Sequence, residues 1–450
     1  MLHMTKLSQL TEQLIAAAKQ AGADAADALA VDGTSLSVEV REGKLEQAER
    51  SEGIEIGLRV LVGKRQACVS ASDIQPSTIA EMSDRAVAMA RLAPDDPYAG
   101  LAEADQLASN FDSAALQLAE DESEPDPAAL QDLAKQAEAS ALEFDGISQV
   151  QTATAGHSRH NIHLAASNGF TGGYSRTGNS LYCVAIAGEG AAMERDYFGE
   201  NRIHRGDLPD PADVGRIAAE RAISRQGARK APTGSFPVLY DERISSGLIG
   251  HLLGAANGSA VSRGSSWLQG RLGEQVLPDH LSITENPHRP RTSGSRLFDA
   301  EGLATKPRTI VENGVLQGWT LDLATARKLG MESTANAARG TSAPPSPSNS
   351  NIELTQGEKT QDELLQDMGT GLFVTSLIGS SINPTTGDYS RGASGFWVEN
   401  GEITHPVNEC TIAGNLLDML MRIQPANDAR THLSHVVPSL LIEGLTIAGD

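Results

Sequence analysis

The stretch Gly387–Leu420, GDYSRGASGFWVENGEITHPVNECTIAGNLLDML, decides how the C-terminal part of the chain folds. Within it, VENG (398–401) lies between apolar segments, and the same tetrapeptide recurs at 311–314. Asn-Gly between apolar segments is the strongest short-range signal for a β-hairpin. Two such hairpins in one region predict a large antiparallel sheet or a sandwich. Upstream, SFPVLYDERISSGLIGHLLGAA (235–256) predicts a strand that leads into a helix.

The rest of the C-terminal region contains shorter elements. Helices are expected at 324–331 and 361–369. The segment TSAPPSPSNSN (341–351) between them is rich in proline and serine. Such a composition predicts an extended or mobile loop.

The first part of the chain alternates between helices and short strands. Helices are expected at about 5–22 and 77–92, the second with Ser77 or Thr78 as its N-cap. The segment between them has period-two apolar runs, which predict an antiparallel meander. Three glycines are expected to separate these strands: Gly43, Gly53 and Gly63.

An acidic segment with two prolines, DESEPDP (121–127), marks a boundary. A helix at about 127–142 is expected to follow it. The next block, 147–200, is rich in predicted strands and contains Asn168-Gly169, a signal for a type I′ hairpin. The segment PADVGRIAAERAISRQ (211–226) predicts another helix.

These patterns predict an α+β chain with three domains. Two small units of antiparallel strands plus helices are expected at 1–120 and 121–230, forming a mixed α/β N-terminal region. A β-rich antiparallel domain is expected at 231–450. A length of 450 residues suits two or three cores rather than one.

The composition restricts the partners that the chain can have. The formal net charge is −22, from 36 Lys and Arg against 58 Asp and Glu. This field repels a phosphate backbone, so no nucleic-acid partner is expected. The N-terminal segment reads as an amphipathic helix and not as a signal peptide, and no apolar run suits a membrane span. A cytoplasmic location with no membrane partner is therefore expected.

The cysteines predict neither a disulfide framework nor a zinc ribbon. There are three, Cys68, Cys183 and Cys410, far apart and without a C-x-x-C pair. Each is interpreted as a small packed residue rather than a nucleophile.

The stretch Gly387–Leu420 closely resembles the C-terminal signature of the TldD/PmbA family. DPYAGL, MERDY, VENG with ARKLG, and MGTGL recur in the family's order, so the resemblance spans most of the chain. TldD-type members are zinc metallopeptidases with a His-Glu-x-x-x-His motif. Here the corresponding segment places His251 at the first histidine, but Leu252 replaces the glutamate and Ala256 the second histidine.

A third TldD-type feature, a cysteine close to the C-terminus, is also missing after Cys410. The corresponding region, THLSHVVPSLLIEG, offers only His432 and His435. The resemblance is therefore to the PmbA branch, also called TldE, which looks like the metal-free half of a two-subunit protease. It implies no catalytic residue and no metal or other cofactor in this chain.

The family resemblance also implies partners. A TldD-type metallopeptidase subunit is expected to supply the zinc, and the two chains to form a heterodimer that degrades or trims flexible peptides. Antitoxin turnover and the maturation of modified peptides are the activities associated with such pairs. The substrate is expected near a glycine-rich segment, because small residues admit a peptide backbone closely. This segment comprises Gly387, Asp388, Tyr389, Ser390, Arg391 and Gly392.

Other polar clusters have two interpretations each. His157 and His163 would share one face of a strand, with His160 on the other, and ordinary surface or hairpin positions are favoured over metal ligands. A set of charged residues could pair with one another or line a groove, and structural ion pairs are favoured. The set is Glu194, Arg195, Asp196, Asp388 and Arg391.

Two alternative functions stay open at this point. The chain could be a stand-alone metallopeptidase in which His251 acts with distant ligands. The candidate ligands are His280, His288 and His435. It could also be a non-enzymatic protein that binds or scaffolds peptides. Metal analysis of the purified chain separates the stand-alone enzyme from a metal-free subunit.

Overall fold

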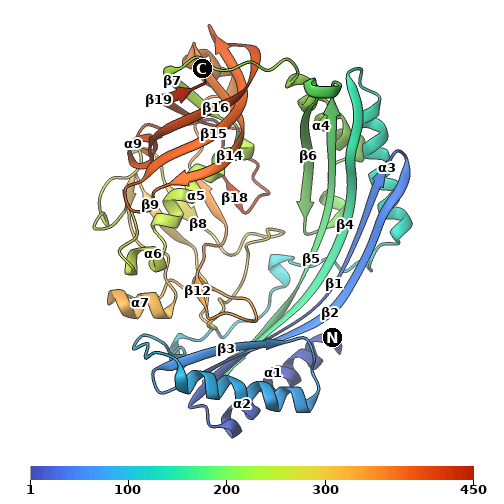
Figure 1. The fold of residues 1–450 in the computed structure, drawn as a ribbon. Coiled ribbons are helices and arrows are strands. Elements are labelled where there is room, and N and C mark those ends of the chain that lie inside the picture. The colour runs from blue at the N-terminus through green and yellow to red at the C-terminus, as the bar shows by residue number, and fades with distance from the viewer. Residues whose placement is uncertain (1, 450) are drawn as a thin grey trace.

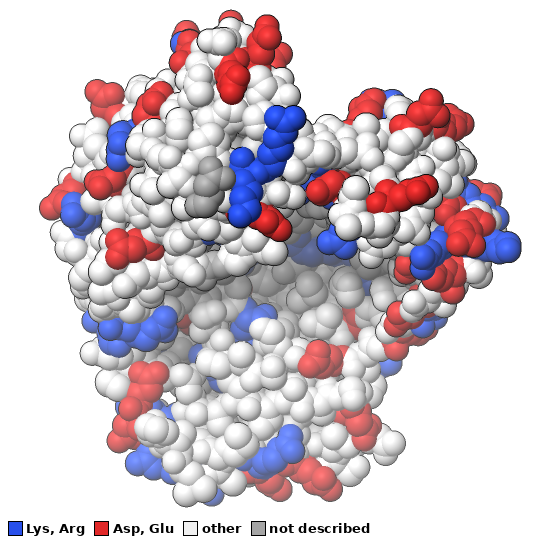
Figure 2. Space-filling view, turned by 45° about the horizontal axis from the view of Figure 1, so that its top comes forward, with Lys and Arg blue, Asp and Glu red and all other residues white. Residues whose placement is uncertain are grey.

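The computed structural model describes residues 2–449, and the fold is α+β as predicted. A long curved sheet with its helices arcs around one side of a β-rich C-terminal domain (Figure 1). Figure 2 shows a deep hollow between the two parts. No helix within residues 2–449 is both long and apolar enough to cross a membrane.

The curved sheet has six antiparallel strands in the order β3-β2-β1-β4-β5-β6. Its strands are β1 (Ala25–Arg41), β2 (Lys44–Val62), β3 (Arg65–Ala71), β4 (Ile147–Ala166), β5 (Thr171–Ala187) and β6 (Glu194–Arg202). Strand β1 pairs with β2 on one side and with β4 on the other. The regions 1–120 and 121–230 therefore contribute to one continuous sheet.

The predicted meander β1-β2-β3 is confirmed, with one correction. Gly43 and Gly63 lie in the turns with positive φ, as expected. Gly53 does not separate two strands. It lies inside β2, opposite Gly33 of β1. Pairing with β1 continues through this position, so the ladder overrides the local tendency of glycine to break a strand.

The Asn-Gly turns are hairpins, but they are not all of one type. Asn313-Gly314 and Asn400-Gly401 have positive φ at both residues, as type I′ requires. At Asn168-Gly169 only the glycine has positive φ, so the predicted type I′ turn is wrong there. The Gly169 N–H donates to the Ala166 carbonyl at 3.1 Å, and the Ala166 N–H donates to the Phe170 carbonyl at 2.9 Å. These bonds close a three-residue loop, in which a single left-handed glycine suffices.

Four helices cover the outer face of the curved sheet. They are α1 (Leu2–Ala21), α2 (Pro76–Leu92), α3 (Pro127–Leu142) and α4 (Pro211–Ser224). Proline begins three of them, where its missing N–H costs nothing. The N-cap of α2 is Gln75, without a side-chain bond, so the predicted cap at Ser77 or Thr78 is wrong. The Thr78 hydroxyl instead donates to Asp73 at 2.6 Å.

Successive side chains of β1 point to opposite faces of the curved sheet. Even-numbered residues such as Ala28 and Val38 pack under the helices, in one core with α1 and α2 and in another with α3 and α4. Odd-numbered residues face the C-terminal domain. Among them, Asp27 forms ion pairs with Arg59 of β2 and with Arg339 of the C-terminal domain. Both faces of the sheet are therefore covered around Asp27, whereas Ser35 and Ser37 further along β1 are exposed.

The C-terminal domain contains two larger sheets and one small one. The first has the order β16-β15-β14-β7-β19-β17 and the second β10-β9-β8-β13-β18, while β11 pairs with β12. Two parallel pairs, β7–β14 and β13–β18, interrupt the antiparallel arrangement predicted for this region. The segment 341–351 is extended, and its residues Ser350 and Asn351 are buried.

The strands are β7 (Gly234–Tyr240), β8 (Ile283–Glu285), β9 (Arg308–Glu312), β10 (Val315–Leu316), β11 (Ala337–Ala338), β12 (Ser346–Pro347), β13 (Ile352–Leu354), β14 (Gly371–Ile382), β15 (Asp388–Glu399), β16 (Glu402–Asn415), β17 (Gln424–Pro425), β18 (His435–Val436) and β19 (Leu440–Ala448). The helices are α5 (Glu242–Ala255), α6 (Gly258–Ser262), α7 (Leu323–Leu329), α8 (Gln361–Met368) and α9 (Leu416–Leu420). Short 3-10 turns occupy Ala104–Gln106, Ala114–Leu116, Gly190–Ala192 and Arg205–Asp207.

Candidate functional site

Helix α5 carries the first position of the degenerate zinc motif. The Asp241 side chain caps the helix by accepting the Arg243 N–H at 3.0 Å. His251 is partly buried, and its ring meets Tyr389 of β15 edge-on with 6.0 Å between ring centroids. Burial, together with the nearby Arg391 guanidinium, lowers the pKa of His251. The imidazole is therefore neutral at physiological pH.

The other two positions of the motif do not fit a zinc ion. Leu252 and Ala256 are fully buried in the core of the C-terminal domain, and Ala256 is the C-cap that follows α5. Their side chains are hydrocarbon, so they offer neither a metal ligand nor a base. Across residues 2–449, no three His, Cys, Asp or Glu side chains converge in a way that could hold a metal ion.

The three histidines weighed as distant ligands for His251, and His432 from the region of the missing cysteine, lie in separate environments. His280 is largely exposed beside Asp279. His288 contacts the Thr305 hydroxyl at 3.1 Å, and His435 lies in β18 opposite Ile352 of β13. His432 lies 3.2 Å from a carboxylate oxygen of Glu200. The structure does not bring them together as a ligand set.

The three histidines of β4 alternate as a strand requires. His157 is buried, with its Nδ1 2.8 Å from the side-chain oxygen of Asn179. His163 is also buried, with its Nδ1 2.9 Å from the Thr11 hydroxyl of α1. His160 is exposed and lies opposite Gly33. Two of the three therefore have hydrogen-bonded roles in the packing of the sheet.

The predicted substrate segment 387–392 is divided between core, surface and cavity. Gly387 and Tyr389 are buried, and Gly387 packs against Trp267. Asp388 is exposed and accepts a hydrogen bond from the Thr386 hydroxyl at 2.6 Å. Ser390 and Gly392 lie in the ladder between β14 and β16. Arg391 differs from the others, because its side chain lines a cavity.

This cavity, of about 440 Å³, lies where β6, α5 and β14 meet. Its walls are formed by Arg195, Asp196, Tyr197, Arg225, Arg243, Ile244, Ser246, Gly247, Thr375, Ser376, Leu377 and Arg391. Strand β7 pairs with β14 only at Leu372–Val374, because the chain then turns into α5. Beyond Val374, no strand within residues 2–449 pairs with this side of β14. The cavity therefore borders an open strand edge.

Of the charged residues of MERDY, Glu194 and Asp196 form ion pairs, while Arg195 and Asp196 line this cavity. Asp196 lies 3.3 Å from Arg243 and 3.5 Å from Arg225, and Glu194 lies 3.7 Å from Arg225. These ion pairs do not involve Arg391 of GDYSRG. The Arg391 Nε instead donates to the Gly379 carbonyl at 2.8 Å. Asp196 thus connects β6 to the N-terminal end of α5.

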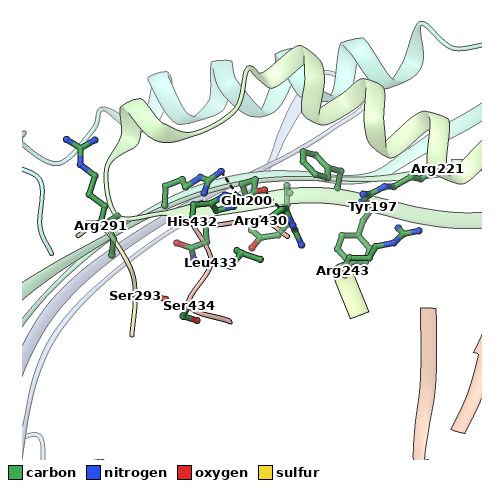
Figure 3. Close-up of a pocket in the computed structure, with 16 residues that line it drawn as sticks. Tyr197, Glu200, Arg221, Arg243, Arg291, Ser293, Arg430, His432, Leu433 and Ser434 are labelled. Atoms are coloured by element: carbon green, nitrogen blue, oxygen red, sulfur yellow. Dashed lines mark hydrogen bonds and ion pairs between the residues drawn. The ribbon is translucent and has the colours of Figure 1, made fainter. Parts of the chain in front are cut away.

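A second cavity, of about 410 Å³, shares Tyr197 and Arg243 with the first (Figure 3). Five arginines line it: Arg202, Arg221, Arg243, Arg291 and Arg430. The sequence analysis missed it. Its residues come from six separate segments of the chain, so no local motif signals it. We call it the arginine cavity.

None of the cysteines is a candidate nucleophile. Burial raises the pKa of Cys183 to about 12 and that of Cys410 to about 11. Burial also raises the pKa of Cys68, which is partly exposed. All three thiols are free, and at neutral pH they are protonated, which makes them poor nucleophiles.

Comparison with known proteins assigns a family to almost the whole chain. Three family profiles match in order: PmbA/TldA metallopeptidase domain 1 at 26–90, the central domain at 120–226 and the C-terminal domain at 233–449. The protein named metalloprotease PmbA from Escherichia coli O157:H7 is 38% identical over 95% of this chain and 93% of its own length. The metalloprotease PmbA homologue of Haemophilus influenzae is 37% identical over 99% of this chain and 96% of its own.

Solved structures have the same fold. A protein from Bacteroides thetaiotaomicron matches with a TM-score of 0.90 and 28% identity, covering 98% of both chains. TldE from Thermococcus kodakarensis matches with a TM-score of 0.84 over 98% of this chain and all of its own, although only 20% of residues are identical. The chain therefore belongs to the PmbA/TldD family, with PmbA proteins among its relatives.

Proposed function

We propose that this chain is the non-catalytic, PmbA (TldE)-type subunit of a two-chain cytoplasmic metallopeptidase. A TldD-type chain with an intact His-Glu-x-x-x-His motif supplies the zinc and the base. The present chain forms the second wall of the chamber that holds flexible peptide substrates. The assembled enzyme degrades or trims such peptides, as in antitoxin turnover or the maturation of modified peptides.

The observation that carries this proposal is the chemistry of α5. The positions equivalent to a glutamate and a histidine hold Leu252 and Ala256, both packed in the core. A single, partly buried His251 cannot hold zinc alone, because protein zinc sites use three or four ligands. The relatives named metalloproteases support a peptidase context, and the side chains on α5 support a non-catalytic place within it.

The shape of the molecule supports a role in substrate binding. The hollow between the two parts is open to one face (Figure 2). From Thr375 onward, the open side of β14 borders the cavity of about 440 Å³ described above. Extended peptides bind to such edges through main-chain hydrogen bonds, which tolerate many sequences. This suits a protease whose substrates are defined by flexibility rather than by a motif.

The test is to purify this chain and a TldD-type chain separately and then mix them. Size-exclusion chromatography is expected to show co-elution, with a lasting interface above roughly 1,000 Å² of total buried surface. Cleavage of a flexible peptide is expected from the mixture and not from this chain alone. A TldD-type chain that is fully active alone, or that does not co-elute, would refute the partnership.

Metal analysis tests the non-catalytic assignment independently. After dialysis against a weak chelator, elemental analysis of this chain is expected to find far less than one zinc per molecule. One tightly held zinc, lost in His251→Ala, would instead support the stand-alone metallopeptidase. Peptide binding without cleavage by any mixture would support the scaffold alternative.

A further inference from the structure

The arginine cavity concentrates positive charge in a strongly acidic protein. The chain has a net charge of −22, yet the walls of this cavity hold five arginines and His432 against a single carboxylate, Glu200. Figure 3 shows Arg430 and His432 beside Glu200, with Arg221 and Arg243 at one end and Arg291 at the other. Figure 2 shows basic side chains within the hollow. A basic cleft of this kind focuses the field on an incoming anion.

The cations of the cavity are incompletely neutralised. Glu200 lies 3.3 Å from Arg430, 3.2 Å from His432 and 3.6 Å from Arg202, and Arg430 also pairs with Glu242 at 2.7 Å. Outside the cavity wall, Asp196 and Asp241 pair with Arg243, and Asp207 pairs with Arg291. The Nε of Arg202 is buried and has no hydrogen-bond partner. Arg221 donates to the Tyr197 carbonyl at 3.1 Å and lies over the Phe198 ring, and among residues 2–449 it forms no ion pair with a carboxylate. Two guanidinium groups are thus left with hydrogen-bonding capacity for a further acceptor.

Burial makes these charges costly. It lowers the pKa of both Arg202 and Arg221, and the neighbouring Arg243 lowers that of Arg221 further. An anion beside either guanidinium group would offset this cost, because charge-assisted bonds from a guanidinium fork to a carboxylate are among the strongest hydrogen bonds in proteins.

The cavity also has the size and the apolar surface of a binding site. Its volume of about 410 Å³ falls within the range of roughly 300–1,000 Å³ that is typical of ligand pockets. Tyr182 and Tyr197 line it and are exposed to 36% and 56%. Through Tyr197 and Arg243 it adjoins the cavity beside the open edge of β14. An extended chain could therefore occupy both cavities.

We propose that the arginine cavity binds a carboxylate of a peptide, either the C-terminal group or an acidic side chain, through Arg202 and Arg221. The inference rests on the proposed function, in that the ligand is a peptide substrate. The carboxylate oxygens accept hydrogen bonds from a guanidinium group of these two arginines, and an adjacent apolar residue of the peptide packs on Tyr182 and Tyr197. A peptide along β14 would thereby be held at one point of its length.

The test uses the full chain alone and three short peptides that carry an uncharged fluorescent dye at the N-terminus. The first is Gly-Ser-Gly-Ser-Phe with a free carboxylate, the second is its C-terminal amide, and the third is the amide of Gly-Ser-Glu-Ser-Phe. Fluorescence anisotropy is expected to show that the first binds at least about tenfold more tightly than the second. If the third binds like the first, an acidic side chain suffices, and if it binds like the second, the terminus is required.

Variants locate the binding. Arg202→Gln with Arg221→Gln is expected to weaken binding of the free acid to the level of the amide. Arg216→Gln is the matched control, since Arg216 lies on the same helix as Arg221 but is exposed and paired with Asp213 and Glu220. Arg221→Lys keeps the charge but loses the planar fork, so an intermediate loss is expected. Circular dichroism identifies variants that fail to fold, and the comparison of acid with amide needs no variant.

The proposal is overturned if acid and amide bind equally, or if the folded double variant binds as tightly as the wild type. It is also overturned if inorganic phosphate binds in the cavity while none of the peptides does, because the site would then serve a free anion. Loss of co-elution with a TldD-type chain, with peptide binding intact, would refute the proposed function and leave this inference standing. The reverse pattern would refute this inference alone.

Discussion

Replacing Asp27 by asparagine tests how the curved sheet is fixed to the C-terminal domain. The Asp27 carboxylate is buried and accepts the Arg59 Nε–H at 2.6 Å. It also binds Arg339, which belongs to the C-terminal domain, and both arginines are almost completely buried. Burial alone would raise the pKa of Asp27, but Arg339 and Arg59 together hold it below its ordinary value. One carboxylate therefore neutralises two cations at the junction.

The substitution leaves both guanidinium groups without a charged partner. Removal of one member of a buried ion pair costs about 3–5 kcal/mol, a large part of the total stability of a typical protein. Arg339→Met should cost less, because Asp27 keeps its contacts with Arg59. Asp84→Asn, on the exposed side of α2, is the matched control and should stay within about 0.5 kcal/mol of the wild type.

Urea unfolding followed by two probes measures the effect. All three tryptophans, Trp267, Trp319 and Trp397, lie in the C-terminal domain, whereas circular dichroism reports on both parts. In Asp27→Asn the circular dichroism transition should begin at lower urea than the fluorescence transition, since the junction is weakened. A urea midpoint equal to that of Asp84→Asn would refute the reasoning.

The same ion pairs predict a pH dependence. Because the pKa of Asp27 is lowered in the folded protein, its stabilisation is present above the ordinary value of 3.8 and is lost as the pH falls through the folded value.

Three further outcomes are expected. Burial and the neighbouring Asp299 raise the pKa of Glu301, so the wild type loses stability as the pH rises from the ordinary value of 4.5 towards the folded value. Glu301→Gln removes this loss of stability, so it should raise the melting temperature more at pH 8 than at pH 5. An equal rise at both pH values would contradict the prediction. His251→Ala should leave the peptidase activity of the two-chain complex within a few-fold of wild type, and a complete loss would place His251 in the catalytic site. Leu252→Glu with Ala256→His should lower the melting temperature, because a buried carboxylate costs several kcal/mol. The double variant should not bind zinc; a stable protein that holds zinc would show that a third ligand from this chain is not needed.

Local chemistry explains what the sequence could predict. Asn313-Gly314 and Asn400-Gly401 form their turns because both residues tolerate positive φ. The helices that begin at Pro127 and Pro211 follow aspartate caps, which are equally local signals. Such features depend on a few adjacent residues, so the sequence contains them in full.

Long-range pairing explains what the sequence could not predict. Gly53 looks like a break in a strand, and only the partner strand β1 makes it a strand interior. The arginine cavity joins residues as distant as Arg202 and Arg430. The composition gives no sign of it, because the chain as a whole is acidic while Glu200 is the one carboxylate of residues 2–449 that lines the cavity. Nothing in the local sequence distinguishes Arg221, which lines the cavity, from Arg216, which does not.

The double pairing of β1 sets a limit on how the chain can be divided. A fragment that ends near residue 120 would contain β1 and β2 but not β4. One edge of β1 would then be unpaired from Asp27 to Val40. An unpaired edge of that length is a template for association with other chains, and such a fragment should aggregate. A chimaera between members of the family must therefore exchange β1 to β6 together. The sequence boundary between the first two family regions is not a boundary between units that can fold alone.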